Sequence, residues 1–301
     1  MTSWVVLLPI VIGGAAVAVM VLWAFTPGGR RRLSRTWIRQ QGAPVTVELT
    51  REIEDERWRR QLGALLGLLI GLAAVIPVIR QFDPTEDQNL VPYLAIFAIP
   101  YVLIVVGRSV GGLIGAIREA RGPVRVAPVW QPRLTDYVSP AGLVAVRIST
   151  PAIAGVAIAA IRLPSWAGWG FGPDQSGYAW SVLVAVVLIW AAVEMVARYL
   201  VAQPQPSGDA LTWFWRQALR GERLRELYLL LSGLGFMFPL LVSFSITRPV
   251  AGEHLVKISV STMAMAALLL SLVAQMLLLK VPSSAHGRQA LQAARRAYET
   301  V

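Results

Sequence analysis

Seven stretches of the chain are long and apolar enough for each to cross a lipid bilayer as a helix. Such a helix needs about 20 predominantly apolar residues. Windows of this kind lie near residues 4–25, 62–80, 90–109, 148–165, 178–200, 226–246 and 256–280. The fourth window is the weakest because it contains Pro151, Gly155 and many alanines. Only 15% of the residues are charged, against roughly 25% in soluble domains. The sequence therefore predicts an all-α, polytopic transmembrane helix bundle.

The arginines predict how these helices are oriented. Four of them directly follow the first window, at positions 30, 31, 32 and 35. That window is too long for the apolar part of a secretory signal, so we expect an uncleaved anchor. The positive-inside rule then places the N-terminus outside and residue 30 in the cytoplasm. With seven alternating spans, 24 of the 28 Lys and Arg residues lie on the cytoplasmic side. We expect a multi-pass protein of the cytoplasmic membrane whose C-terminus is inside.

The predicted spans divide the chain into an anchor, a bundle and a tail. The transmembrane anchor occupies residues 1–29, the six-helix bundle residues 30–281 and the basic cytoplasmic tail residues 282–301. The cytoplasmic loops of the bundle are expected at residues 30–61, 110–147 and 201–225. The second loop carries a short apolar phrase from Val124 to Trp130, and the segment from Val45 to Leu49 is a candidate to pair with it.

The bundle itself consists of three hairpins with a similar layout. Each begins with a residue able to cap a helix, at Thr50, Thr135 and Asp209. Each reaches a proline near the far side of the membrane, at Pro77, Pro164 and Pro239. Duplication of one unit and the features that all membrane helices share are both open as explanations. Duplicated units would be parallel repeats, so the midplane site of inverted repeats is not expected.

Two glycine ladders predict where membrane helices touch. Each has a spacing of four residues, and the members are Gly63, Gly67 and Gly71 in the second window and Gly107, Gly111 and Gly115 in and after the third. Small residues let helix backbones approach closely in lipid, where the hydrophobic effect does not drive association. Antiparallel helices would bring the ladders face to face within one hairpin. Packing of each ladder against another protomer is the alternative, and the sequence leaves the oligomeric state open.

The segment from Asp209 to Arg220 has the pattern of an amphipathic helix. Its apolar residues recur at helical spacing, at Leu211, Phe214, Trp215, Ala218 and Leu219. Its cations lie on other faces, at Arg216, Arg220 and Arg223, and Gly221 is expected to end the helix. We expect this helix on the cytoplasmic membrane surface. It is either an interfacial anchor with snorkelling arginines or a coupling helix that contacts a soluble partner.

Ionisable side chains inside the predicted spans are few. Glu194 is the one acid well inside a window, and Arg198 follows it by one helical turn. The two residues form either a shallow interfacial ion pair or part of a cytoplasm-facing polar cavity. Arg108 and Gln275 lie at a comparable depth by residue counting and are the other candidates for that cavity.

The sequence argues against an enzyme and against a bound cofactor. The chain has no cysteine, and its two histidines, His254 and His286, belong to no paired ligand motif, so neither a metal nor a haem is expected. No glycine-rich phosphate loop followed by Lys-Ser or Lys-Thr occurs, so no ATPase is expected in this chain. Nucleic-acid binding is not expected either, because the cations are spread over all the cytoplasmic ends.

One segment, RYLVAQPQPSGDALTWFWRQALRGERLREL at residues 198–227, resembles part of uncharacterised multi-pass membrane proteins of actinobacterial type. In them a Pro-Gln-Pro stretch precedes an acid-capped helix that contains alanine and arginine, and the helix is more acidic where Trp213 to Trp215 stand here. The resemblance implies a membrane location and no activity.

Two functions are consistent with these features. The first is a transport-associated subunit, permease-like or accessory, whose cytoplasmic segments meet a separate ATPase or another membrane subunit. The second is a non-catalytic structural or regulatory membrane protein that acts through its cytoplasmic loops. A polar cavity would favour the first function, and a solid bundle packed by the glycine ladders would favour the second.

Overall fold

The residues that the structure describes are mostly helical and include one short pair of strands. This computed structural model describes residues 19, 26–41, 43–81, 91–120, 125–126, 133–151, 155, 173–203, 205–206, 210–246, 266 and 269–278. The labelled helices are α2 (Pro27–Gln41), α3 (Val47–Gln81), α4 (Val91–Ala120), α6 (Pro173–Ala202) and α7 (Ala210–Ile246). Two further helical segments cover residues 140–151 and Leu269–Leu278, and a 3₁₀ turn, η1, covers Leu134–Asp136.

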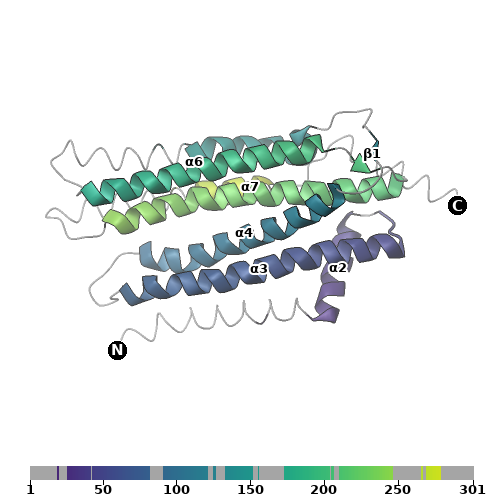
Figure 1. Cartoon of the computed structure of the whole chain (residues 1–301), viewed down its shortest axis with the longest axis horizontal. Helices are drawn as coiled ribbons and strands as arrows, with labels where there is room; N and C mark the ends of the chain where they lie inside the picture. The colour runs from purple at the N-terminus through teal and green to yellow at the C-terminus, as the bar shows by residue number, and fades with distance from the viewer. Residues whose placement is uncertain are drawn as a thin grey trace.

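The four long helices run side by side in the order α3, α4, α7, α6 (Figure 1). The chain reverses direction from α3 to α4 and again from α6 to α7, so α3 and α7 begin at the same end of the bundle. We call this the charged end. Helix α2 crosses the bundle here, roughly at right angles to the long helices (Figure 1).

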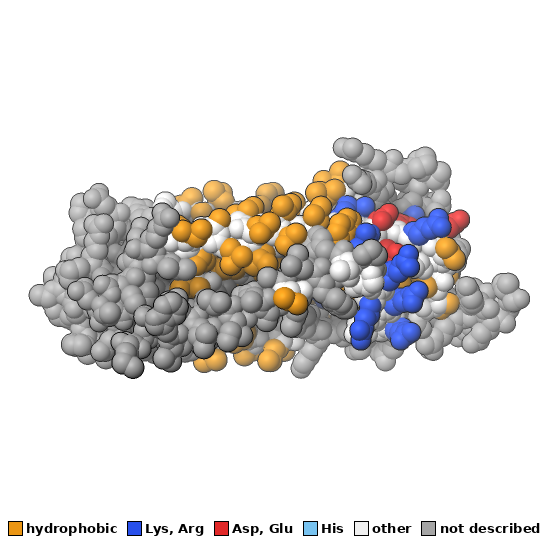
Figure 2. Space-filling view, turned by 90° about the horizontal axis from the view of Figure 1, so that it is seen from below, with side chains coloured by type: hydrophobic (Ala, Val, Ile, Leu, Met, Phe, Trp, Pro, Cys, Tyr) orange, Lys and Arg blue, Asp and Glu red, His pale blue; other side chains and the backbone are white. Residues whose placement is uncertain are grey.

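Three of the described helices are long and apolar enough to cross a membrane. They lie at Val47–Pro77, Ala98–Ile117 and Leu183–Ala202, and they contain or overlap the second, third and fifth predicted windows. Large apolar side chains are exposed along them, including Leu66, Ile70 and Leu188. Figure 2 shows hydrophobic side chains as a band over the middle of the face seen there, with arginine side chains beyond the band. An exposed apolar surface of this extent is typical of a membrane-embedded bundle.

The structure covers the other four windows to different extents. The sixth, 226–246, lies within α7. Of the fourth, only residues 148–151 and 155 are described, and of the seventh, residues 266 and 269–278. The first window, except for residue 19, and the tail at residues 282–301 lie outside the described residues.

Backbone contact between glycines joins α3 to α4. A Cβ atom added to Gly63 would overlap the carbonyl oxygen of Gly107, and one added to Gly67 would overlap that of Leu103. A Cβ at Gly71 would come within 2.6 Å of the Cα of Pro100. Only glycine permits such an approach, because the opposing atoms are backbone and cannot rotate away. The two ladders therefore face each other within one hairpin.

Much of the sequence between the predicted spans is helical. Helix α2 and the first 15 residues of α3 occupy most of the predicted loop 30–61, and α7 begins at Ala210 within the predicted loop 201–225. Gly221 does not end a helix, because α7 continues through it to Ile246. A single interior glycine costs a helix only about 1 kcal/mol, which the packing of neighbouring residues offsets.

The predicted pairing of two short apolar phrases is also corrected. Strand β1 (Arg125–Val126) pairs antiparallel with β2 (Gln205–Pro206) rather than with the segment from Val45 to Leu49. Val47 instead begins α3, where the Thr46 hydroxyl accepts a hydrogen bond from the backbone N–H of Leu49 at 3.3 Å. This cap starts the helix within the segment that was a candidate for pairing.

Candidate functional site

Seven charged side chains meet inside the bundle near the charged end. We call them the ionic cluster; its members are Glu56, Arg57 and Arg60 of α3, Arg108 of α4, and Glu222, Arg223 and Glu226 of α7. Charged side chains are rarely buried unless they are paired. The cluster is therefore the feature of the described chain that most needs a physical explanation.

Arg60 lies at the centre of the ionic cluster and is 2% exposed. Its guanidinium is 3.0 Å from Glu56 Oε1, 3.0 Å from Glu222 Oε2 and 3.4 Å from Glu226 Oε1. It also donates a hydrogen bond to the Leu219 carbonyl oxygen at 3.3 Å. One arginine thus joins α3 to two successive turns of α7.

Arg223 makes the second link between these helices. Its Nε donates to Glu56 Oε1 at 2.8 Å and its Nη2 donates to Glu56 Oε2 at 3.0 Å. This two-pronged geometry is the strongest form of an arginine–carboxylate pair. Glycines of α4 make room for it: a Cβ at Gly115 would overlap the Glu56 carboxylate, and one at Gly112 would lie 3.3 Å from Arg60 Nε.

The outer members of the cluster are closer to solvent. Arg57 lies 3.2 Å from Glu222, and Arg108, whose side chain is 42% exposed, contacts Glu226 and lies 3.7 Å from Glu222. Burial alone would raise the pKa of Glu222, but the neighbouring guanidinium groups of Arg60, Arg57 and Arg108 outweigh burial and hold this pKa below the ordinary carboxyl value. Glu222 is therefore ionised at neutral pH.

An aromatic cluster lies next to the ionic cluster. The rings of Trp37 from α2 and Trp215 from α7 are 5.6 Å apart. Trp215 is fully buried and its indole N–H donates to the Pro44 carbonyl oxygen at 2.8 Å. Ile53 of α3 and Leu219 of α7 belong to the same core. Together the two clusters join α2, α3 and α7 into one packed unit, which we call the terminal body (α2 with residues 47–61 of α3 and 210–225 of α7).

The segment predicted to be an interfacial helix belongs to this body. Leu211, Trp215 and Leu219 are buried against protein, Phe214 packs at the edge of the same core and Arg216 is half-buried. Arg220 is also buried and donates to the Gln203 carbonyl oxygen at 3.2 Å. The segment follows the bundle axis as part of α7 and does not lie across it (Figure 1). Its apolar stripe packs against other helices, and this corrects the predicted membrane-surface location.

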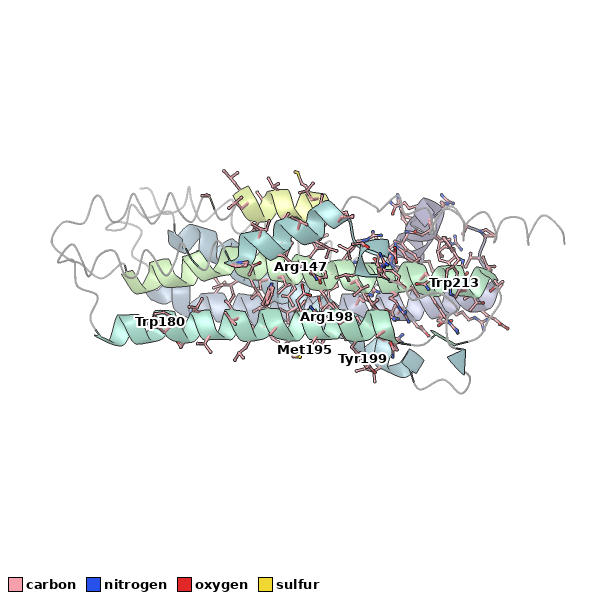
Figure 3. All side chains as sticks on the ribbon, turned by 90° about the horizontal axis from the view of Figure 1, so that it is seen from above. Arg147, Trp180, Met195, Arg198, Tyr199 and Trp213 are labelled. Carbon is pink, nitrogen blue, oxygen red and sulfur yellow. The ribbon has the colours of Figure 1, made fainter. Side chains whose placement is uncertain are left out.

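Glu194 makes its closest interactions with residues far away in the sequence. It accepts two hydrogen bonds from Arg147 of the 140–151 helix, at 2.9 and 2.8 Å, and one from the Tyr228 hydroxyl at 3.0 Å. Arg198, on the next turn of α6, is exposed (Figure 3). Glu194 therefore pairs with Arg147 of another helix, and not with Arg198 of α6 as one of the two predictions had it.

The four residues predicted to line a cavity lie in separate groups. Arg108 belongs to the ionic cluster, and Glu194 contacts Arg147 and Tyr228. Gln275 accepts a hydrogen bond from the Tyr101 hydroxyl at 3.0 Å and donates one to Ser271 at 3.3 Å. The described side chains of these residues therefore do not converge on one space.

Sequence reasoning missed the central residues of the ionic cluster because their segments were predicted to be loops. A signal was present: an acid followed directly by arginine occurs just before an apolar window twice, at Glu56-Arg57 and at Glu222-Arg223. Both motifs add a charged residue four positions after the acid, Arg60 and Glu226. Helical spacing of this kind places both side chains on one face.

The ionic cluster is suited to structure rather than to metal binding or catalysis. Each of its carboxylates has a guanidinium within 3.4 Å. Among the residues that the structure describes, no group of three or more His, Cys, Asp or Glu residues is placed to hold a metal ion. No family model, no curated protein and no solved structure matches the chain.

Proposed function

We propose that this chain is an integral protein of the cytoplasmic membrane with a non-catalytic structural or regulatory role, exerted through the terminal body. In this proposal the chain has seven spans, an outer N-terminus and an inner C-terminus, and the terminal body projects into the cytoplasm. The observation that carries the proposal is the buried ionic cluster, which fixes α3 and α7 to each other where they leave the apolar band.

The lengths of α3 and α7 support a projecting body. Helix α3 begins 15 residues before Leu62, where the apolar window starts, and α7 begins 16 residues before position 226. At 1.5 Å per residue, both helices extend about 22–24 Å beyond the apolar segments. The headgroup layer on each side of a bilayer is only about 5–8 Å thick. Two membrane helices that continue so far as packed rods offer a rigid surface to a soluble protein.

The internal pairing of charges supports a non-catalytic role. Arg60 and its three carboxylate partners contact one another rather than an open site. A catalytic acid or base needs access to a substrate, whereas a buried, mutually neutralised network fixes the arrangement of helices. The glycine contacts of α3 with α4 also favour a non-catalytic role, because the backbones of the two helices pack directly against each other there.

A transport-associated subunit without its own ATPase is the second candidate, and one observation favours it. Glu194, Arg147 and Tyr228 form a polar group between helices, and Glu194 and Tyr228 lie within predicted spans. Ionisable residues within membrane spans often mark the path of a substrate or ion. In this alternative, the terminal body is the contact surface for a separate ATPase.

Cysteine labelling tests the orientation, because the chain has no cysteine of its own. Gln40→Cys places a thiol on the exposed face of α2, and Asn89→Cys places one in the predicted outer loop. A membrane-impermeant maleimide should label Asn89→Cys in intact cells and Gln40→Cys only after permeabilisation. The opposite pattern would reject the proposed orientation.

Site-specific photo-crosslinking in cells separates the two functions. A photoreactive residue at Glu52, exposed on the part of the terminal body that α3 contributes, should give an adduct with a soluble protein, whereas the lipid-facing control position Leu69 should not. A nucleotide-binding subunit as the adduct would favour transport. A different soluble protein would favour a structural or regulatory role. Equal yields from Glu52 and Leu69 would contradict a docking role for the terminal body.

A further inference from the structure

The arginines of α2 form a cationic face on a helix that is otherwise packed into the protein. The sequence of α2, PGGRRRLSRTWIRQQ, contains five arginines and no acid. Ser34, Trp37 and Ile38 are buried and hold α2 against the terminal body. Arg31, Arg35 and Arg39, spaced by four residues, are exposed on the outward face. The helix is thus amphipathic, and its apolar side is already occupied by protein.

Two contacts fix the depth of α2 relative to the apolar band. The guanidinium of Arg30 lies over the ring of Trp58 at 4.3 Å, and that of Arg57 lies over the ring of Trp37 at 4.9 Å. Trp58 precedes Leu62, the first exposed leucine of the apolar part of α3, by four residues. One turn of helix is about 6 Å. This distance places the Arg30 end of α2 at the edge of the headgroup layer, which is about 5–8 Å thick.

The orientation of α2 agrees with that depth. Helix α2 crosses the long axis of the bundle (Figure 1), so it runs parallel to the plane of a membrane that the long helices cross. Figure 2 shows arginine side chains gathered directly beside the apolar band. A row of exposed arginines parallel to the membrane, beside the headgroup layer, can reach several phosphate groups at once through its long side chains.

We infer that the outward face of α2, with Arg31, Arg35 and Arg39, binds the headgroups of anionic phospholipids. The inference rests on the membrane insertion proposed above. Guanidinium groups are suited to phosphate because their planar donors match its oxygens. A soluble acidic protein is a less suitable occupant, because the neighbouring lipid surface would restrict its approach to α2. The site would select anionic over zwitterionic lipid.

Lipid selectivity of the full-length protein tests the inference. The chain is reconstituted in phosphatidylcholine vesicles that contain a trace of spin-labelled phosphatidylglycerol or spin-labelled phosphatidylcholine. The fraction of each label immobilised by the protein gives their relative association. Each arginine near an anionic surface contributes about fivefold to binding. The double variant Arg31→Gln/Arg35→Gln should therefore lose most of the preference for phosphatidylglycerol.

A matched double variant controls for net charge. Arg51→Gln/Arg133→Gln removes two exposed arginines from other elements. Arg51 lies 11 residues before Leu62, about 16 Å along the helix and beyond the headgroups. This control should keep the preference, and both doubles should melt at nearly the wild-type temperature because the substituted side chains are exposed. Equal losses in the two doubles would overturn the inference, since net charge alone would then set the preference.

Three further results would also overturn it. The first is a wild-type protein that immobilises both labels equally; the chain is then embedded in lipid but has no anionic site. The second is that neither label is immobilised, which would reject the proposed membrane insertion as well. The third is loss of the preference on adding inorganic phosphate, or a short oligonucleotide, at constant ionic strength. The arginines would then form a site for free anions or for nucleic acid.

Discussion

A single methyl group added at Gly67 tests whether backbone contact holds α3 against α4. In the structure, the new Cβ of Gly67→Ala would overlap the Leu103 carbonyl oxygen, whereas an ordinary contact requires 3.4–4 Å. The oxygen belongs to the backbone of α4 and cannot rotate away. The helices must therefore move apart by more than 1 Å or bend, and the adjacent contact of Gly63 with Gly107 must loosen with them.

Two opposing terms set the size of this effect. Overpacking of a close interface costs about 1–3 kcal/mol, and the upper end applies where backbone opposes backbone. Alanine is the better helix former, which favours the variant by about 1 kcal/mol. We expect a net loss of about 2 kcal/mol in the free energy of unfolding. For a chain of this size that corresponds to a decrease in Tm of about 4–8 °C.

Gly221→Ala is the matched control. Gly221 also lies inside a long helix, but a Cβ there would be 3.7 Å from the ring of Tyr137, an ordinary contact. The higher helix propensity of alanine should therefore stabilise this variant without a packing cost and raise its Tm by about 2–4 °C. Thermal unfolding of both purified variants in one detergent, followed by tryptophan fluorescence, measures the two shifts. Equal shifts of the same sign in the two variants would refute the argument that close backbone contact distinguishes Gly67.

Three other predictions concern the charged groups. Arg60→Met should lower the free energy of unfolding by about 3–5 kcal/mol, because it leaves buried carboxylates without their central partner; a chemical denaturation midpoint equal to that of wild type would contradict this. Because the pKa of Glu222 is lowered in the folded state, its contribution to stability is complete above pH 4.5 and is lost as the pH falls through the folded-state pKa. In a series of Tm measurements at falling pH, the Tm of Glu222→Gln should therefore decrease less than the Tm of wild type. Glu194→Gln should reduce thermal stability more than Arg198→Gln does, since Glu194 is buried in a two-pronged pair and Arg198 is exposed; equal Tm values for the two variants would argue that the pair contributes nothing.

The sequence predicted the helical class and the position of the closest helix contact. Membrane spans are recognisable because each must be apolar over about 20 residues, whatever its neighbours are. The glycine ladders were equally informative, since no residue other than glycine allows backbones to touch. Both signals depend on local composition, which a single sequence contains in full.

The ionic cluster was not predictable in the same way. Arg60 meets Glu222 and Glu226, which are more than 160 positions away, and no local pattern specifies such a partner. The charges before each apolar window were interpreted as signals of cytoplasmic orientation, which is the usual role of arginine at a membrane boundary. Likewise, the apolar stripe of the segment from Leu211 to Leu219 has the same period whether it packs on lipid or on Trp37.

The position of the ionic cluster between α3 and α7 suggests why charged side chains are buried there in place of apolar ones. A hydrophobic core in its place would hold α3 and α7 together as well, since removing an entire buried ion pair is often neutral or stabilising. Apolar side chains, however, would tolerate a shift of one helix along the other by a turn. Arg60 and Arg223 would not tolerate this shift. Their guanidinium groups reach the carboxylates of Glu56, Glu222 and Glu226 at only one axial position of α7 relative to α3. We propose that the cluster fixes the axial position of α7 against α3. Shifting Glu222 and Glu226 by one helical turn in sequence should then misplace the terminal body even where the apolar packing is kept. An unchanged crosslinking pattern from Glu52 in that variant would show that the apolar contacts alone set the register.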